Sequence, residues 1–167
     1  MAKIADEPAP TSNGGATWAP ATPAELLAAP GYQARRMYQA YLAAWVRTVD
    51  ATLTGPQFAV LTAVACSPGV DQGSLAASVA LDRSTMGDLA RRLEERGLIV
   101  RETPPSDGRR KLLYLTEEGH ATYQQVNARA RMLDERLLAG RSPGDRRRLL
   151  EVMQELAEHW EAIAPPS

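Results

Sequence analysis

One segment limits what this chain can fold into more than any other: residues 81–119, LDRSTMGDLARRLEERGLIVRETPPSDGRRKLLYLTEEG. It begins with a helical pattern, because Met86, Leu89 and Leu93 recur every three or four residues and would face inward together. Gly97 is a helix stop, and two short apolar runs follow it on either side of a polar tip with an Asp-Gly turn signal. A helix, a strand, a tight turn and a second strand in this order predict a winged helix-turn-helix.

Local signals set the expected ends of these elements. The helix should be capped by Asp82 or Ser84 and run to Arg96, since Asp and Ser side chains accept backbone N–H hydrogen bonds at helix N-termini. The wing strands should span residues 98–103 and 111–115. A helix can enter the major groove of B-DNA, and a wing with a basic tip can reach phosphates or the minor groove. The layout therefore points to DNA binding.

Helical patterns also flank this segment. Amphipathic spacing and helix start signals predict helices over residues 24–28, 34–49, 57–66 and 116–138, and one after Ser142. Pro30 and Gly31 should separate the first two. The outer helices carry more apolar surface than one small domain can cover, which predicts a dimer interface; burial within one chain is the alternative.

The expected fold is mainly α, a winged helix-turn-helix with a small two- or three-stranded β wing and N- and C-terminal dimerisation helices. The expected parts are a disordered arm (1–22), an N-terminal dimerisation helix (23–53), a DNA-binding domain (54–116) and C-terminal dimerisation helices (117–167). The arm contains three prolines and a Gly-Gly pair but no apolar core segment, so it does not resemble a signal peptide.

Composition narrows the function classes. With 167 residues and 44% apolar composition, the chain is long enough for one domain with a core, and too short for an enzyme domain plus a separate DNA-binding domain. A net charge of −1 means that any DNA affinity must be local, and residues 82–111 hold eight Lys or Arg against six Asp or Glu. One cysteine excludes an intrachain disulfide, and no apolar run reaches a membrane span, which predicts a soluble cytoplasmic protein.

Four motifs carry a resemblance to a known family. They are Asp82-Arg83-Ser84-Thr85, the run LEERGLIVR at residues 93–101, Asp107-Gly108-Arg109-Arg110-Lys111, and LTEEG at residues 115–119. In order and spacing they resemble the MarR family of bacterial transcriptional regulators, and the likeness extends over roughly residues 23–163. The resemblance implies a homodimeric repressor whose operator affinity is lowered by a small ligand, often an aromatic acid or phenol. Many relatives carry a Thr-Arg pair where this chain has Gly87 and Asp88, so no base contact is assigned to those two positions.

The recognition helix supplies the first candidate DNA contacts. Arg83, Ser84 and Thr85 lie at its N-terminal end, where side chains reach base edges and helix N–H groups reach phosphates. For Ser84 and Thr85 the structural alternative is a simple helix cap. Arg91 is a further candidate on the outer face of the helix, and its alternative is a solvated or salt-bridged arginine.

The wing tip supplies the second set of candidates, Asp107, Arg109 and Arg110. An Asp-x-Arg turn lets Asp107 orient Arg109 by a bidentate ion pair, so that the arginine points at the minor groove, a role that the family resemblance also implies. The alternative is a turn-stabilising pair that makes no DNA contact.

Six of the nine aromatic residues lie between Trp18 and Phe58, close in sequence to basic residues. An aromatic wall with a guanidinium suits a planar carboxylate, and the predicted ligand residues are Arg36, Tyr38, Tyr41, Trp45 and Phe58. Dimer packing is the alternative. The segment GYQARRMYQ at residues 31–39 resembles the first helix of MarR-type regulators of aromatic-acid breakdown, which favours a ligand of that class.

Other chemistry finds little support in the sequence. Cys66 ends an apolar helix with no basic neighbour, which predicts a buried structural cysteine. His120 and His159 are too few for a metal site, and no phosphate-binding loop, nucleophile elbow or dinucleotide fingerprint is present, so no metal, cofactor or enzymatic activity is expected. A ligand-responsive repressor is the main hypothesis. A winged helix that binds an acidic protein and a single-cysteine oxidant sensor are the alternatives.

Overall fold

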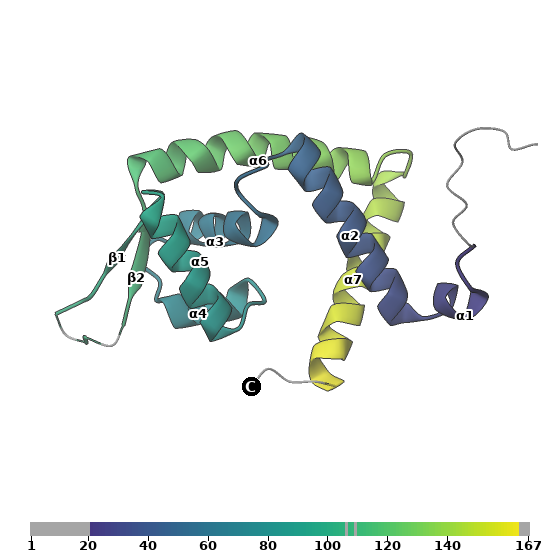
Figure 1. Cartoon of the computed structure of the whole chain (residues 1–167), viewed down its shortest axis with the longest axis horizontal. Helices are drawn as coiled ribbons and strands as arrows, with labels where there is room; N and C mark the ends of the chain where they lie inside the picture. Colours follow the sequence, from purple (N-terminus) through teal and green to yellow (C-terminus); the bar gives the residue numbers. More distant parts are fainter. Residues whose placement is uncertain (1–20, 106, 109, 164–167) are drawn as a thin grey trace, which may run out of the picture. The chain divides into compact units, whose positions relative to one another are not determined.

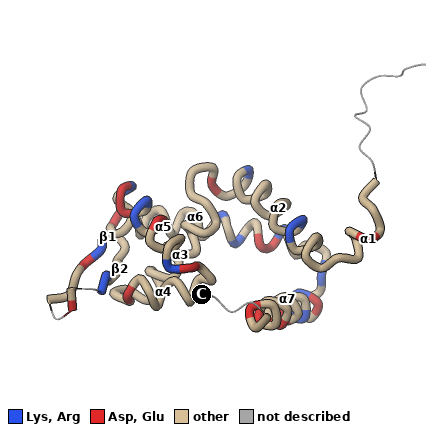
Figure 2. Tube along the Cα trace, turned by 60° about the horizontal axis from the view of Figure 1, so that its bottom comes forward, with Lys and Arg blue, Asp and Glu red and all other residues tan. Residues whose placement is uncertain are grey.

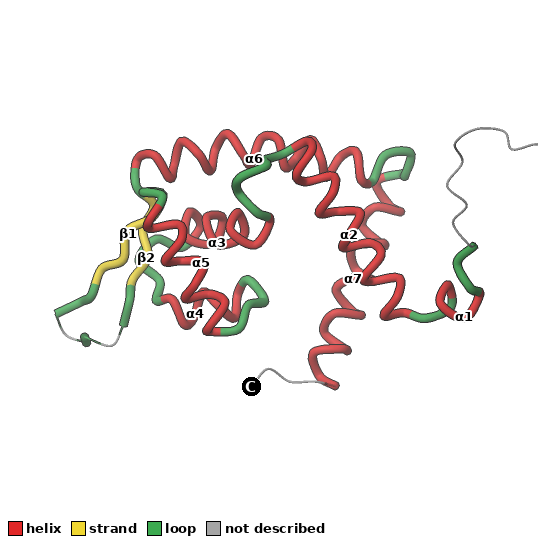
Figure 3. The backbone as a smooth tube through the Cα atoms, viewed as in Figure 1, coloured by secondary structure: helices red, strands yellow, loops and turns green. Residues whose placement is uncertain are grey.

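The computed structural model describes residues 21–105, 107–108 and 110–163. These residues form seven helices and two strands (Figure 3): α1 (Ala24–Leu27), α2 (Pro30–Thr48), α3 (Gly55–Cys66), α4 (Gln72–Ser78), α5 (Arg83–Glu95), β1 (Ile99–Glu102), β2 (Leu112–Leu115), α6 (Glu117–Leu137) and α7 (Pro143–Ile163). The predicted class, mainly α with a small β wing, is confirmed. None of the described helices is both long and apolar enough to cross a bilayer.

The chain divides into two compact units, the first ending at Met37 and the second beginning at Tyr38. In the first unit, the side-chain amide of Gln33 donates to the carbonyl of Leu27, 2.7 Å away. The predicted break at Pro30 and Gly31 is wrong, because α2 begins at Pro30 itself. A proline is tolerated in a first helical turn, where its missing N–H has no intrahelical partner to lose.

The core of the second unit forms around α3. This helix is apolar on all sides, as expected of a helix covered from more than one direction, and Val60, Leu61 and Val64 have no exposed surface. It packs against α4, α5, α6 and β2. Figure 1 shows α6 lying along one side of α3 and the α4–α5 pair on the other. The helix-turn-helix and α6 therefore share one hydrophobic core.

Side-chain caps fix where the helices begin. Thr54 and Gln57 form a reciprocal capping box at α3, and Thr116 accepts the N–H of Gly119 at the start of α6. Asp82, rather than Ser84, caps α5. At the other end of α5, Gly97 has a φ of 71°, the left-handed conformation predicted for the helix stop.

The wing is an antiparallel pair in which Ile99 faces Leu115 and Glu102 faces Leu112. Each strand is shorter than expected. A third strand is present only as an isolated bridge between Asp71 and Leu112. The N–H of Gly69 also donates to the carbonyl of Leu113, at 2.9 Å. The segment that precedes α4 is thus attached to the root of the wing.

The last two helices differ in burial. In α6, Val126, Ala130 and Leu133 are buried against the core. No residue of α7 is buried. Its exposed large apolar side chains are Leu150, Met153, Leu156, Trp160 and Ile163. The apolar spacing predicted for this helix is therefore an uncovered surface in the single chain.

Candidate nucleic-acid interface and effector pocket

The N-terminal turn of α5 is organised by Asp82. Its carboxylate accepts the backbone N–H of Thr85 at 2.8 Å and the hydroxyl of the same residue at 2.5 Å. Arg83, Ser84 and Thr85 are exposed, and neither Arg83 nor Ser84 forms a side-chain hydrogen bond within the described part of the chain. The turn therefore presents an arginine and a serine beside a threonine that Asp82 holds in place.

These contacts also set the charge state of the cap. Hydrogen bonds from the hydroxyl and the N–H of Thr85 hold the pKa of Asp82 below its usual range. Hydrogen bonds from Ser74 do the same for the pKa of Asp71, which caps α4. Both carboxylates are thus stabilised in their charged forms at the starts of the two helices of the helix-turn-helix.

Acid should destabilise the fold through these caps. A carboxyl whose pKa is lower in the folded than in the unfolded chain contributes stability above its unfolded pKa, and that stability is lost as the pH falls through the folded value. The melting temperature should be flat above about pH 5 and fall below about pH 4, the ordinary range of aspartate. Asp82→Asn should shallow the decline, whereas Asp88→Asn, at an exposed residue of α5 without a side-chain hydrogen bond in the described chain, should leave it unchanged. The same fall in melting temperature at low pH in the wild-type protein and in both variants would contradict this role of Asp82.

Basic and acidic residues both occur along α5 (Figure 2). Arg91 forms an ion pair with Glu95 at 2.7 Å, so it is a salt-bridged arginine in the free protein. Glu94 is paired with Arg101 of β1, and this guanidinium holds the pKa of Glu94 below its usual range. The second pair joins the recognition helix to the first strand of the wing.

Gly87 faces the neighbouring helix and not the outer surface. A Cβ at this position would lie 3.6 Å from the amide nitrogen of Gln72, the first residue of α4. Asp88 is exposed. Where many relatives carry a Thr-Arg pair, this chain therefore has a glycine that packs near α4 and an aspartate whose carboxylate is exposed.

The wing turn is partly described. The predicted ion pair between Asp107 and Arg109 lies outside the described residues, because Arg109 is not among them. The carbonyl of Asp107 accepts the N–H of Arg110 at 3.2 Å. The guanidinium of Arg110 lies 3.6 Å from the carboxylate of Asp71 and is 53% exposed. The wing turn and the α4 cap therefore share one ion pair.

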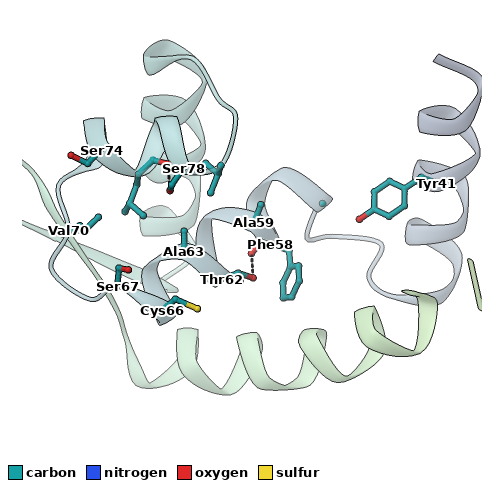
Figure 4. Close-up of a pocket in the computed structure, with 13 residues that line it drawn as sticks. Tyr41, Phe58, Ala59, Thr62, Ala63, Cys66, Ser67, Val70, Ser74 and Ser78 are labelled. Carbon is teal, nitrogen blue, oxygen red and sulfur yellow. Dashed lines mark hydrogen bonds between the residues drawn. The ribbon is translucent and has the colours of Figure 1, made fainter. Parts of the chain in front are cut away.

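A cavity of about 630 Å³ lies in the second unit between α2, α3 and α4 (Figure 4). It is lined by Tyr41, Gly55, Phe58, Ala59, Thr62, Ala63, Cys66, Ser67, Val70, Ser74, Leu75, Ser78 and Val79. In Figure 4, Tyr41 lies at one end, Ser67 and Val70 lie at the other, and Phe58 lies between them. Hydroxyl groups and apolar surface make up this lining, and none of its residues is charged.

Several lining hydroxyls donate back to the protein. Thr62 donates to the carbonyl of Phe58 at 2.9 Å, and Ser78 donates to that of Leu75 at 2.8 Å. Ser74 donates to Asp71 at 2.6 Å. A hydroxyl that donates keeps its lone pairs, so these groups can accept a hydrogen bond from a bound molecule.

The predicted ligand residues take different places. Tyr41 and Phe58 line the cavity. Trp45 lies behind them, 3% exposed, with ring centroids 6.0 Å from Tyr41 and 5.4 Å from Phe58. Tyr38 is 51% exposed and does not line the cavity. Arg36 belongs to the first unit and is exposed.

Sequence reasoning missed the α4 side of the cavity. Ser74, Ser78 and Val79 contribute to it, together with Ser67 and Val70 from the connection between α3 and α4. The available signal was the small-residue sequence of α4, QGSLAAS, in which a helix offers hydroxyl groups with little side-chain bulk. These residues matter because they belong to the helix-turn-helix itself.

The prediction of a buried Cys66 is wrong. The thiol-bearing residue is exposed and lines the cavity. It is the last residue of α3, and only two positions before it Val64 has no exposed surface, so the exposure of Cys66 is confined to the very end of the helix. The described residues contain no group of three or more His, Cys, Asp or Glu that could hold a metal ion.

Comparison with known proteins gives the wider context. A family model described as the MarR family matches residues 53–111, the segment from the end of the α2–α3 connection to the wing. Transcriptional regulator HosA from Escherichia coli O111:H- is 34% identical over 118 residues, which cover 71% of this chain and 86% of HosA.

Solved structures agree in fold. The PcaV transcriptional regulator from Streptomyces coelicolor, in complex with its natural ligand, has a TM-score of 0.79 at 34% identity, covering 82% of this chain and 97% of PcaV. The transcriptional repressor CouR, bound to a 23-mer DNA duplex, has a TM-score of 0.74 at 30% identity, with 80% and 96% covered. BpsR from Bordetella bronchiseptica, whose DNA binding is regulated by 6-hydroxynicotinic acid, has a TM-score of 0.69 at 26% identity, with 76% and 97% covered. The chain therefore belongs to the MarR family of transcriptional regulators.

Proposed function

We propose that this regulator is a homodimeric repressor that binds a pseudo-palindromic DNA site and leaves it when a small aromatic acid or phenol enters the cavity. One observation carries the proposal: Ser74, Leu75 and Ser78 of α4 form a wall of the cavity, and α4 packs directly on the recognition helix α5. A molecule bound there would touch the DNA-binding element itself. The ligand of BpsR and the DNA bound by CouR support both halves of the proposal.

The lining favours a planar, hydroxylated ligand. Phe58 offers a ring face, while Tyr41 and the serine and threonine hydroxyls offer hydrogen bonds. Burial, followed by the charges of Asp134 and Tyr38, raises the pKa of Tyr41, so its phenol stays a hydrogen-bond donor at neutral pH. Because no lining residue is positively charged, the cavity itself offers a carboxylate hydrogen bonds and no counter-ion.

The dimer is part of the proposal. The exposed apolar residues of α7 form a surface that association with a second copy would remove from water. A two-fold dimer would set two α5 helices about one DNA turn apart, ~34 Å, on a palindromic site. A protein that remains monomeric at micromolar concentration would contradict this arrangement.

The exposed thiol favours a second candidate function. Cys66 lines the cavity and is exposed, so an oxidant or electrophile could reach it. In that case peroxide would release the protein from DNA and Cys66→Ser would abolish the response. A wild-type protein that ignores peroxide would remove this candidate.

The main test is an electrophoretic mobility shift on the DNA upstream of the chain's own coding region, with 6-hydroxynicotinic acid, 4-hydroxybenzoic acid and phenol as probes. Specific retardation relieved by one probe supports the proposal. Specific retardation that no probe relieves leaves a DNA-binding regulator and favours dimer packing for the aromatic residues. Absence of specific retardation would instead favour a winged helix that binds an acidic protein.

Thr85 should affect sequence preference more than overall affinity. Thr85→Val removes the exposed hydroxyl but keeps the backbone N–H that donates to Asp82, so α5 should keep its start. Selection from a random duplex library should show a changed base at one position per half-site, a discrimination of about 1–3 kcal/mol. Thr103→Val, whose hydroxyl accepts from Lys111 at the wing, is the control and should leave the preference unaltered. An unchanged selected sequence for Thr85→Val would assign Thr85 to capping alone.

A further inference from the structure

The loop between α2 and α3, residues 50–53, is held by side chains from two distant parts of the second unit. The indole N–H of Trp45 donates to the carbonyl of Leu53 at 2.7 Å. The guanidinium of Arg96 donates to the carbonyl of Thr52 at 3.0 Å and to its hydroxyl at 3.4 Å. Two adjacent residues of one loop thus receive hydrogen bonds from α2 and from the end of the recognition helix.

The Trp45 side of this connection belongs to the cavity wall. The indole packs against Phe58 and Tyr41, with centroid distances of 5.4 and 6.0 Å, and both of those rings line the cavity. Trp45 is only 3% exposed. A protein interior is close-packed, so a ligand that displaces either lining ring must also displace the indole.

The Arg96 side of the connection belongs to the recognition helix. Arg96 is the C-cap residue of α5, and the last turn of this helix is closed by the N–H of Arg96 donating to the carbonyl of Arg92 at 3.2 Å. With 13 residues and a rise of 1.5 Å per residue, α5 is about 20 Å long. A tilt imposed at Arg96 would therefore move the opposite end, where Arg83 and Ser84 are exposed.

The loop itself has little freedom to absorb a displacement. One carboxylate oxygen of Asp50 accepts the N–H groups of Thr52 and Leu53, both at 2.7 Å, and the Thr52 hydroxyl at 2.9 Å. Burial alone would raise the pKa of Asp50, but these hydrogen bonds and the charge of Arg129 outweigh it and keep the pKa low. Arg129, 3.7 Å from the second carboxylate oxygen, attaches the loop to α6.

We propose that Trp45 and Arg96 are positioning residues that couple the cavity to the recognition helix through the α2–α3 loop. A ligand that shifts the aromatic wall displaces the indole of Trp45 and, through its hydrogen bond, the carbonyl of Leu53. The neighbouring carbonyl of Thr52 then moves as well, and the guanidinium of Arg96 carries this movement to the C-terminal turn of α5. The inference rests on the proposed function for its regulatory meaning. The ligand changes DNA affinity only by the difference in its affinity for the two positions of the helix.

The test does not require the natural effector. Cys66 is the only cysteine in the chain, it is exposed, and it lines the cavity. N-Phenylmaleimide would therefore place one aromatic ring at the cavity of the full-length protein. Amide hydrogen exchange of residues 96–98, whose N–H groups close the last turn of α5, then reports the response without any DNA.

Labelling should accelerate exchange at residues 96–98 about fivefold or more in the wild-type protein, within the usual range of coupling between sites. In Arg96→Ala the labelled and unlabelled proteins should exchange equally there. In Trp45→Phe, which keeps an aromatic ring but loses the N–H donor, the ratio of the exchange rate in the labelled protein to that in the unlabelled protein should fall by at least about half. Arg92→Ala is the matched control, because it removes the same charge from α5 without a contact to the loop, and it should keep the wild-type ratio.

Two outcomes would overturn the proposal: no acceleration in the labelled wild-type protein, or an unchanged ratio in Arg96→Ala. Thermal melting of each protein shows whether it is folded, and Arg96→Lys replaces Arg96→Ala if the latter is not. Failure of the proposed function would appear separately, as the absence of specific retardation of DNA in the mobility-shift experiment. The exchange measurement uses no DNA and does not depend on that result.

Discussion

Replacing Gly119 with alanine should lower the free energy of unfolding by about 3 kcal/mol, at the upper end of the cost of overpacking. A Cβ on this buried residue would lie 1.9 Å from the carbonyl oxygen of Leu98 and 2.9 Å from its carbonyl carbon. The backbone of Leu98 cannot easily move away from the new Cβ. Its carbonyl also accepts the N–H of Thr116, which caps α6, and Leu98 is 3% exposed. Urea unfolding would measure the loss as a lower midpoint.

Gly144→Ala is the control for the loss of a glycine from a helix. Its nearest atom, the hydroxyl oxygen of Ser142, would be 3.8 Å from the new Cβ, and the residue lies in the first turn of α7. This change should be neutral or raise stability by about 0.5 kcal/mol, since alanine restricts the unfolded chain. Similar midpoints for the two variants would show that the contact between α6 and the start of the wing is not tight.

The second large effect is expected at the wing. Replacing Arg109 and Arg110 together by alanine should weaken binding to all DNA sequences on the order of 10- to 100-fold and lower the slope of log affinity against log salt by about 2. The expectation for Arg109 comes from the sequence, whereas Arg110 is half exposed in the wing turn just before β2. Fluorescence anisotropy across a salt series, on specific and random duplexes, measures both quantities.

Arg136→Ala with Arg141→Ala makes a matched control, since it removes the same charge at the corner between α6 and α7, at the other end of α6 from the wing (Figure 1). It should leave both quantities near the wild-type values. An unchanged salt slope in the wing variant would refute the predicted phosphate contacts. A loss confined to the specific duplex would instead assign base reading to the wing.

The fold was predictable where the determining interactions are local. Asp82 and Thr116 cap their helices through hydrogen bonds to residues three positions away, and Gly97 ends α5 by its own conformation. Pro30 shows the limit of such signals, because a proline that can end one helix can also begin the next.

The site was less predictable because it depends on contacts between distant segments. Arg96 meets Thr52 across 44 positions, and no local pattern indicates that pair. Cys66 is the last residue of an apolar helix whose other core positions are buried, so the sequence around it predicts burial, whereas the packing leaves this end residue exposed. Tyr41 and Phe58 were found by residue type, and the α4 wall of the cavity was not.

The ion pairs on the proposed DNA-binding side have a kinetic consequence. Arg91, Arg101 and Arg110 are each already matched with a carboxylate, of Glu95, Glu94 and Asp71 respectively. A DNA phosphate must therefore displace a carboxylate from each arginine, and the net gain in binding free energy is small when the contact is brief and poorly aligned. Random stretches of DNA should hold such a protein for short times, so that it travels between sites mainly by dissociating and rebinding, and stays where base contacts add to the exchange.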